Sequence, residues 1–553
     1  MNLIGNINAI PFRRFRGGGG AIPPFPSIPG TIARYSALGL TNEEMSKNPV
    51  WVDKTGNGHD LQMKNFAWGG MSGVGGYKQD YKGNRWTYAS SRADIFYTGN
   101  FINVTSVKIN SVQLYYQAYG GQPSFTVPSY SVKVSGLVEG QNLDYRSSNG
   151  LILNIKEDGI YRLPEFEFSA NGGFYGFQLN KIQESCNITI EQLPLYPGAL
   201  VFDGVDDYGV CENFPILTKE KGYTVVALRQ WITRGEIAQG LVSNVKNWFN
   251  DGAFLLEYRN IQADYLNNPI SFGAIGSEMD LPHILTYQTS KSYNGVSIIT
   301  GNFTGTDVLY VGKLATRNVG ICINAAIWEL VFLDHDATEE ELTKIKDYFV
   351  KTYPWLFPDQ AWTVTGKTNE DEDRATIANI TSNGNDLVLS NFGFIEGSGY
   401  NEEGQYAGYL VTDGVDDSGR AVGLTISKDF TLVGEWILFS KTSVNAGLSI
   451  HPQIHIFNRP EAIQIVFRVA GKTLPVKSLK AICSDGRCYD ENWSELKINV
   501  GEFTNNKGTL FVASNGTNYA QIAFKNLGIY DNHILSKDDC IKAYNYLQTL
   551  KAK

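Results

Sequence analysis

The sequence is poor in cysteine, in charge and in long apolar runs, and each scarcity excludes a class of protein. Six cysteines in 553 residues, with no Cys-x-x-Cys pair, argue against a disulfide scaffold and a structural zinc site. Cys483 and Cys488 flank a four-residue turn that a hairpin disulfide could span, although two reduced thiols are the favoured interpretation. No stretch of about 18 apolar residues occurs, which predicts no membrane span.

Charge and the N-terminus exclude further classes. Charged residues make up 19% of the chain and the net charge is −9, whereas a nucleic-acid-binding protein needs a basic face. We therefore expect no nucleic-acid partner. Met1–Pro11 has no long apolar core, and the arginines at 13, 14 and 16 follow it, unlike a secretory signal peptide. We therefore expect a protein that is made in a bacterial cytoplasm and released by a route such as phage lysis.

What the chain does contain favours β structure. Apolar residues make up 42% of it, which is enough for large cores. Tyrosine (30), phenylalanine (29) and glycine (57) are abundant. Aromatic residues favour strands and glycine favours the turns between them.

An internal repeat divides the chain into two related copies. Asp-Gly-Val-Asp-Asp occurs at 203–207 and again at 413–417, a match that is improbable by chance. Three further matches keep the same order: Asp53–Leu61 with Asn379–Leu387, Lys221–Val226 with Lys428–Val433, and Leu309–Val311 with Leu510–Val512. Each copy then closes with a predicted helix. Thr338 with Glu341, and Ser536 with Asp539, have the spacing of a helix N-terminal capping box.

The first copy carries an insertion. The upstream matches are 326 residues apart, from Asp60 to Asp386, and the downstream matches are 210 apart, from Asp203 to Asp413. The difference is 116 residues, which we place between Trp68 and Leu200. Alternating segments within it, such as Tyr130–Ser135, predict a small inserted β-sandwich.

These observations predict four units. They are an N-terminal anchor at 1–30, a discontinuous first sandwich at 31–84 and 197–354, the inserted sandwich at 85–196, and a second sandwich at 355–553. The anchor is rich in glycine and proline, yet it contains large apolar side chains that could dock on a partner. These residues are Phe12, Phe15, Ile22, Phe25 and Ile28. A disordered leader is the alternative interpretation.

Two motifs carry a resemblance to a known superfamily. Leu200–Tyr208 contains Phe-Asp-Gly followed by Asp-Tyr, and Gly56–Leu61 precedes it. At these motifs the chain resembles laminin-G/concanavalin-A-like domains, although the second copy departs at Thr412 and Ser418. The resemblance implies a mainly β fold with two antiparallel sandwiches of this type. It implies little about function, because one fold hosts many activities.

Other segments resemble particle proteins of crAss-like phages and their relatives that infect Bacteroides. The segments are Thr365–Arg374, Cys186–Pro194 and Tyr196–Leu200. This resemblance implies a virion localisation and a tail or head fibre component. Other virion proteins would bind its N-terminal segment, and the sandwiches would contact host glycans. A homo-oligomer is expected, with a trimer as the first choice.

Candidate chemistry is sparse. A glycosidase needs two carboxylates about the scissile bond, and the closest pattern, Glu165-Phe-Glu167, lies in the insertion and lacks the intervening aspartate. We therefore expect no enzymatic activity. The repeated acidic turns favour either Ca²⁺ as the one candidate cofactor or hydrogen bonds that fix the turn. Their candidate ligands are Asp206, Asp207, Asp416 and Asp417. Possible platforms for sugar rings are Trp86, Trp248 and Trp493.

Three functions compete. The leading hypothesis is a phage virion fibre or appendage with lectin-like sandwiches. A bacterial surface lectin or adhesin is the alternative, and it normally requires a secretion signal. A glycan-degrading enzyme comes third, since the acid pair is missing.

Overall fold

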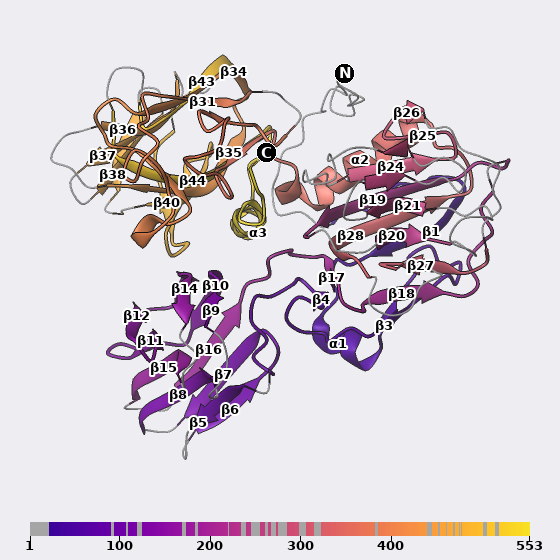
Figure 1. Ribbon diagram of the computed structural model, residues 1–553, viewed down its shortest axis with the longest axis horizontal. Helices are drawn as coiled ribbons and strands as arrows, with labels where there is room; N and C mark the ends of the chain where they lie inside the picture. Colours follow the sequence, from indigo (N-terminus) through magenta and orange to yellow (C-terminus); the bar gives the residue numbers. More distant parts are fainter. Residues whose placement is uncertain are drawn as a thin grey trace.

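The computed structural model is a mainly β protein built from antiparallel sheets that form three sandwiches (Figure 1). The expected mainly β fold of antiparallel sandwiches is thereby confirmed. Within the described residues, no helix has the length and apolarity needed to cross a membrane. The structure describes residues 22–552 except 84, 90–92, 107–108, 119–123, 169–172, 183–185, 219, 234–238, 245–254, 260–263, 267–272, 275–284, 298–305, 314–321, 382–384, 440–444, 452–453, 460–461, 468–469, 475, 477, 501–505 and 515–518.

The first sandwich consists of two eight-stranded sheets. The sheet that faces a helix, here the helix-side sheet, has the order β26 (Val296–Ser297), β25 (Ser292–Tyr293), β24 (Leu285–Thr289), β19 (Thr224–Trp231), β28 (Asn324–Leu333), β17 (Leu200–Asp203) and β4 (Gly73–Val74), with β1 (Thr31–Ser36) also paired to β28. The opposite, far sheet has the order β2 (Val50–Trp51), β3 (Leu61–Lys64), β18 (Tyr208–Cys211), β27 (Leu309–Val311), β20 (Gln239–Ser243), β21 (Leu255–Arg259), β22 (Asp264–Leu266) and β23 (Gly273–Ala274). Alternate residues of β3 are buried in the core between them, as a half-buried strand requires.

The inserted sandwich has two five-stranded sheets and its own apolar core. One sheet has the order β13 (Gly159–Leu163), β10 (Tyr130–Ser135), β16 (Cys186–Gln192), β7 (Phe101–Ser106) and β6 (Ala93–Tyr97). The other has the order β12 (Gly150–Ile155), β11 (Asn142–Ser147), β15 (Phe174–Ile182), β8 (Ile109–Gln117) and β5 (Trp86–Ala89). A short pair, β14 (Phe166–Phe168) and β9 (Phe125–Val127), accompanies them.

The second sandwich repeats the plan of the first. Its helix-side sheet has the order β32 (Gly399–Asn401), β33 (Tyr409–Val411), β44 (Ile522–Asp531), β35 (Phe430–Leu438), β40 (Leu479–Cys483), β41 (Arg487–Asp490) and β42 (Glu495–Lys497), with β29 (Gln360–Thr363) paired to β44. Its far sheet has the order β30 (Thr376–Ile377), β31 (Leu387–Ser390), β34 (Ser418–Ile426), β43 (Asn506–Val512), β36 (Asn445–His451), β37 (Ile454–Arg459), β38 (Ala462–Phe467) and β39 (Ala470–Leu474).

The predicted closing helices form where the capping residues placed them. Thr338 and Glu341 form the expected capping box at the start of α2 (Glu339–Thr352). Ser536 caps α3 (Lys537–Leu547) by accepting a hydrogen bond from the Asp539 backbone. Shorter helical turns are α1 (Asn42–Lys47), η3 (Pro354–Leu356) and η4 (Gly404–Tyr406).

The repeat extends further at the backbone than the sequence match indicated. Asn65 and Asn391 have φ values of 67° and 68°, and Trp68 and Phe394 have 52° and 50°. A Cβ at Gly73 would lie 2.4 Å from an Asn42 oxygen, and the matching Gly399 is equally confined by Asn369. The matched backbone therefore runs on to β4, and the insertion starts after it, inside the predicted span from Trp68 to Leu200.

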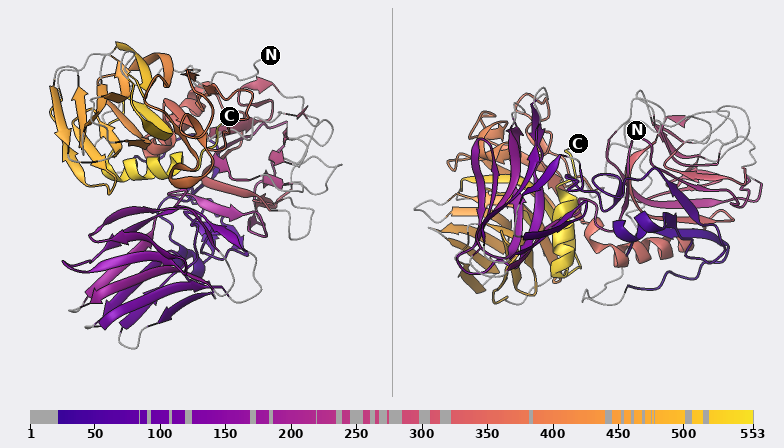
Figure 2. Two further views of the ribbon diagram at one scale, coloured as in Figure 1. Left: turned by 60° about the vertical axis from the view of Figure 1, so that its left-hand side comes forward. Right: turned by 90° about the horizontal axis from the view of Figure 1, so that it is seen from below.

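All three sandwiches meet at one apolar layer, here called the helix layer. It contains α2, α3 and η3 together with the outward side chains of both helix-side sheets, and Ile160 of the insertion packs against it. The Gln230 side chain also donates to Thr549 Oγ1 at 3.2 Å, across the two large sandwiches. Two further views show the insertion beside the second sandwich (Figure 2).

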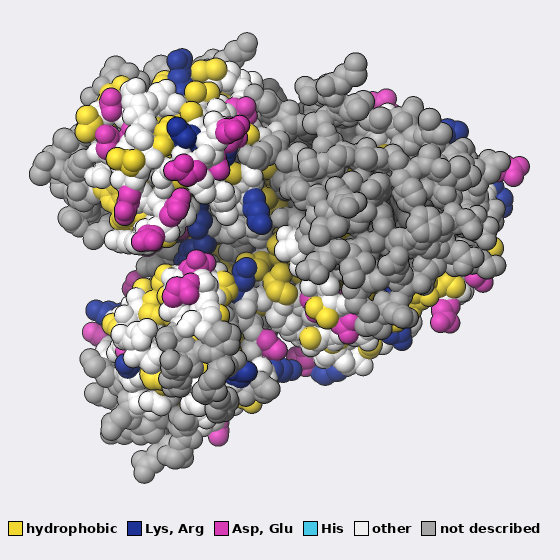
Figure 3. Space-filling view, viewed as in Figure 1, with side chains coloured by type: hydrophobic (Ala, Val, Ile, Leu, Met, Phe, Trp, Pro, Cys, Tyr) yellow, Lys and Arg dark blue, Asp and Glu magenta, His cyan; other side chains and the backbone are white. Residues whose placement is uncertain are grey.

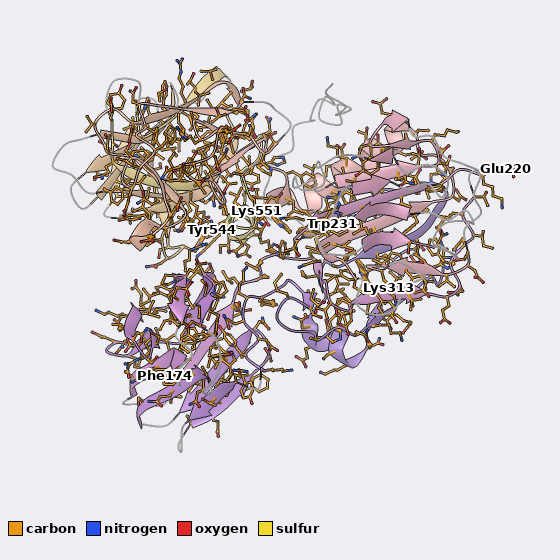
Figure 4. The ribbon with its side chains drawn as sticks, in the orientation of Figure 1. Phe174, Glu220, Trp231, Lys313, Tyr544 and Lys551 are labelled. Atoms are coloured by element: carbon orange, nitrogen blue, oxygen red, sulfur yellow. The ribbon has the colours of Figure 1, made fainter. Side chains whose placement is uncertain are left out.

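A group of charged and phenolic side chains, here called the charge cluster, lies at the junction between insertion and second sandwich. Glu435 of β35 is 3.7 Å from Arg162 of the insertion and 3.7 Å from Lys480. Its Oε1 accepts a hydrogen bond from Tyr409 Oη at 2.7 Å, and Lys480 donates to Tyr544 Oη at 3.0 Å. Charged side chains gather on both sides of this junction in Figure 3, and Tyr544 points into it in Figure 4.

Candidate functional site

The acidic repeat forms the turn that crosses from the helix-side sheet to the far sheet. In the first sandwich the turn joins β17 to β18. The buried Asp207 carboxylate accepts hydrogen bonds from Ser72 Oγ at 2.9 Å and from the Asp203 backbone at 3.0 Å. Asp203 Oδ1 in turn accepts from the Val205 backbone at 2.8 Å. These contacts fix the turn, and Gly204 supplies the positive φ of 84° that it requires.

The second copy reproduces this network atom for atom. Asp417 accepts from Ser398 Oγ at 3.1 Å and from the Asp413 backbone at 2.9 Å. Asp413 accepts from the Val415 backbone at 2.7 Å. The repeated sequence therefore encodes a repeated hydrogen-bonded turn.

Each turn brings three carboxylates together. Oxygens of Asp203, Asp206 and Asp207 lie within 4.8 Å of one another, as do those of Asp413, Asp416 and Asp417. The sequence reasoning named the last two aspartates of each turn as calcium ligands and missed Asp203 and Asp413, which are as close. Both oxygens of Asp207 already accept hydrogen bonds, as predicted if these carboxylates fix the turn and do not bind a metal ion. Burial, followed by the neighbouring Asp203 charge, raises the pKa of Asp207 to about 7.

The tryptophan platforms predicted from the sequence are wrong for two of the three residues. Trp86 is 7% exposed and contacts Tyr81 and Tyr175 in the core of the insertion. Trp493 is 2% exposed and packs edge-on against Tyr544 in the helix layer. Buried indoles offer no face to a sugar ring. Trp248 lies outside the described residues.

Part of the predicted docking segment binds the chain itself. The Phe25 ring lies 4.5 Å from the Arg34 guanidinium and 5.1 Å from the Tyr348 ring of α2. Ile28 is buried in the helix layer. Their predicted role in docking a partner is therefore corrected to packing on the first sandwich. Ile22 is 60% exposed, and Phe12 and Phe15 lie outside the described residues.

The far sheets present a second candidate site that the tryptophan search missed. Tyr310 of β27 pairs with Val210 and Ser243, and Phe511 of β43 pairs with Arg420 and Ser449, so the two aromatic rings hold matching positions. Their neighbours Leu309, Val311, Leu510 and Val512 point into the cores, so both rings point outward. Each ring remains half-buried. The sequence already indicated that these rings correspond, because Leu309-Tyr-Val311 matches Leu510-Phe-Val512 in the repeat.

A cation accompanies the aromatic residues in both far sheets. Lys313 lies 4.4 Å from the Tyr208 ring, and the Tyr208 and Tyr310 rings are 6.4 Å apart. In the second copy the Arg420 guanidinium lies 5.7 Å from the Phe511 ring. His455 hydrogen-bonds to Ser449 at 3.2 Å in the same row. An outward ring beside a cation can stack on a sugar and pair with a carboxylate or sulfate. The far-sheet pairs are therefore Tyr208 with Lys313, next to Tyr310, and Phe511 with Arg420.

Comparisons with known proteins identify no family. No family model matches the chain, and no curated protein matches it. Among solved structures, Trypanosoma rangeli sialidase in complex with sialic acid is 9% identical, with a TM-score of 0.24 over 82% of each chain. The botulinum neurotoxin serotype D binding domain is 10% identical, with a TM-score of 0.24 over 62% of this chain and 90% of the other.

These matches correct one expectation. The sequence led us to expect no enzymatic activity, yet solved structures similar to this chain include sialidases, which are enzymes. At TM-scores of 0.24 and 0.25 the likeness assigns no reaction and no catalytic residue to the chain.

Proposed function

We propose that the chain is a component of a bacteriophage particle that binds acidic glycans of the host surface through its far sheets. The observation that carries this proposal is the outward aromatic ring at matching places of both far sheets, Tyr310 and Phe511, each in a group of side chains that includes a cation. The cation comes from a different strand position in each copy, Lys313 in the first and Arg420 in the second. Other exposed positions of the matched strands differ between the copies, such as Gln62 against Val388. Retention of the outward ring through that divergence, with a cation close by in each copy, supports a shared ligand chemistry.

The resemblance to phage particle proteins supports the proposed location on a phage particle. Residues before Ile22 precede a segment that packs on the first sandwich through Phe25 and Ile28. We propose that those preceding residues bind other virion proteins while the sandwiches project outward. The oligomer, with a trimer as first choice, belongs to the same proposal.

Glycan binding is tested with an acidic host polysaccharide and with the same polysaccharide after chemical reduction of its carboxyl groups. The full chain is compared with the double variant Tyr310→Ala/Phe511→Ala. We expect the double variant to lose about fivefold in affinity at each far sheet, since a ring contact contributes roughly 1 kcal/mol. Phe96→Ala is the matched control, because Phe96 is 62% exposed on β6 of the insertion and outside the far sheets. Equal binding by the double variant, or no preference for the acidic form, contradicts the proposed site.

The particle setting is tested separately. Purified phage particles are imaged with an antibody raised against residues 362–553. Label at one defined place on the particle supports a virion component and distinguishes head from tail. Unlabelled particles, with the protein free in the lysate or on bacterial surfaces, contradict it and favour the adhesin alternative.

A further inference from the structure

The charge cluster at the junction between the insertion and the second sandwich contains more positive than negative charge. Arg162 and Lys480 each lie 3.7 Å from the Glu435 carboxylate. Lys525 of β44 lies beside the cluster, 5.1 Å from the ring of Tyr409, whose hydroxyl donates to Glu435 at 2.7 Å. Three cations therefore surround one buried carboxylate, and three positive charges minus one negative charge leave a net charge of +2.

Two further charged residues on the insertion side leave this balance unchanged. Lys78 interacts electrostatically with Arg162, and Glu165 interacts with Lys525. One is positive and the other negative, and both residues are exposed, so water and salt screen them. The excess positive charge therefore belongs to the buried part of the junction.

Lys525 stands at an irregular point of β44. Glu435 of β35 pairs with Asn526, and the next residue of β35 pairs with Phe524. Lys525 is therefore an extra residue between two pairs. Such a bulge changes the direction in which a side chain points, and bulges are common beside functional sites. Here the bulge places the Lys525 ammonium over the Tyr409 ring, next to the charge cluster.

The first sandwich has the same irregularity but apolar side chains there. The register of β19 and β28 shifts at the matching place, where the extra residue is Trp328. By the same registers, Glu435 corresponds to Leu228. Leu228 and Trp328 are both fully buried in the helix layer. The shared fold therefore does not require charges at these two positions, and the second copy carries them where Arg162 of the insertion packs against it.

An excess of buried charge is unfavourable unless an opposite charge compensates it. Burial, followed by the charge of Arg162, lowers the pKa of Lys525, as expected for a cation held beside other cations. The Lys525 ammonium forms no hydrogen bond or ion pair with any other described residue, and Lys525 is only half-buried. Arg162 lies 3.7 Å from Glu435, beyond the roughly 2.8 Å of a charge-assisted hydrogen bond. Both cations can therefore donate hydrogen bonds to an anion that enters from solvent.

We propose that a small oxyanion with two negative charges, hydrogen phosphate or sulfate, binds between Lys525 and Arg162 and holds the insertion on the second sandwich. Its charge compensates the excess of the junction. The planar guanidinium of Arg162 matches two oxygens of such an ion, and the Lys525 ammonium pairs with it as a point charge. Because the two cations belong to different sandwiches, the bound ion strengthens the contact between them. The site is separate from the far sheets and does not depend on glycan binding there.

The test titrates inorganic phosphate into the full chain at pH 8 by calorimetry, with chloride added to keep the ionic strength constant. We expect saturable binding of one ion per chain, in competition with sulfate. The melting temperature should rise by several degrees when the site is filled, because the ion binds only the folded junction. Nitrate, which carries a single negative charge, should not reproduce this rise at equal ionic strength.

Lys525→Gln is the informative variant. It should weaken phosphate binding by roughly tenfold or more, since a hydrogen bond to a charged group is lost, and it should abolish the phosphate-dependent rise in melting temperature. Without phosphate it should melt no lower than the wild type, because it removes a desolvated charge, whereas loss of a purely structural lysine would lower the melting temperature. Lys54→Gln is the matched control, because it removes the same charge from an exposed position of the first sandwich and should bind phosphate like the wild type.

Four outcomes would overturn the proposal. They are no saturable binding of phosphate, unchanged binding in Lys525→Gln, an equal loss in Lys54→Gln, and a rise in melting temperature with nitrate as large as that with phosphate. A Lys525→Gln protein that melts clearly below the wild type in phosphate-free buffer would also contradict it, since the lysine would then stabilise the junction without an anion.

Discussion

Replacing Glu435 by glutamine should weaken the junction between the insertion and the second sandwich. The Glu435 side chain is 3% exposed, and its Oε2 faces Arg162 at 3.7 Å without a hydrogen bond. At that distance a charge pair contributes about 4–5 kcal/mol of gross Coulomb energy at an effective dielectric constant near 20. Removing one partner of a buried pair costs about 3–5 kcal/mol, because the other charge stays desolvated. The Arg162 side chain is 23% exposed, so we expect the lower end, about 3 kcal/mol.

The measurement is chemical unfolding of the full chain, followed by intrinsic fluorescence and by proteolysis of the insertion. Glu435→Gln should unfold at lower denaturant, with the insertion cleaved first. The control is Glu43→Gln, which removes a pair with Lys47 whose side chains are 74% and 71% exposed and should leave the denaturation midpoint almost unchanged. If both variants behave alike, the charge cluster does not hold the junction and the reasoning is refuted.

Four further predictions concern the turns and a helix cap. Burial raises the pKa of Asp207 to about 7, so between about pH 4 and 7 the folded state holds a proton that the unfolded chain has released. Raising the pH through that range should therefore lower the free energy of unfolding by roughly 2–4 kcal/mol. Asp207→Asn should flatten this dependence of stability on pH. If the turn binds Ca²⁺, added Ca²⁺ should raise the melting temperature at pH 8 in the wild type but not in Asp206→Asn. That result would favour the metal role of the turn over the hydrogen-bonded one. Ser72→Ala and Ser398→Ala should each cost about 1–2 kcal/mol, since each leaves a buried carboxylate oxygen without its donor, and a loss in one copy alone would show that the turns are not equivalent. Thr338→Ala should cost about 1 kcal/mol through loss of the capping box, whereas Thr338→Ser should be close to neutral in the same thermal melt.

The sequence predicted the features that depend on local pattern. The capping box at Thr338 and the strand at Tyr130–Ser135 form as expected, because short-range hydrogen bonding and alternation decide them. The internal repeat predicted two related sandwiches. It also located the paired acidic turns, although the participation of Asp203 and Asp413 required the folded turn.

Features that depend on long-range packing could not be predicted. Trp86 and Trp493 stand in polar sequence surroundings, yet each is buried by residues distant in the chain. Phe25 likewise found its partners, Arg34 and Tyr348, within the chain instead of on another protein.

The junctions between the sandwiches form a closed ring of three connections. The first sandwich is covalently continuous with the insertion, the insertion touches the second sandwich through Arg162 and Glu435, and the second returns to the first through the helix layer. When a pulling force opens one connection, the other two keep the separated surfaces close, at an effective concentration on the order of millimolar. The opened contact then re-forms quickly when the force drops. A molecule built in this way withstands intermittent pulling better than three sandwiches joined only end to end.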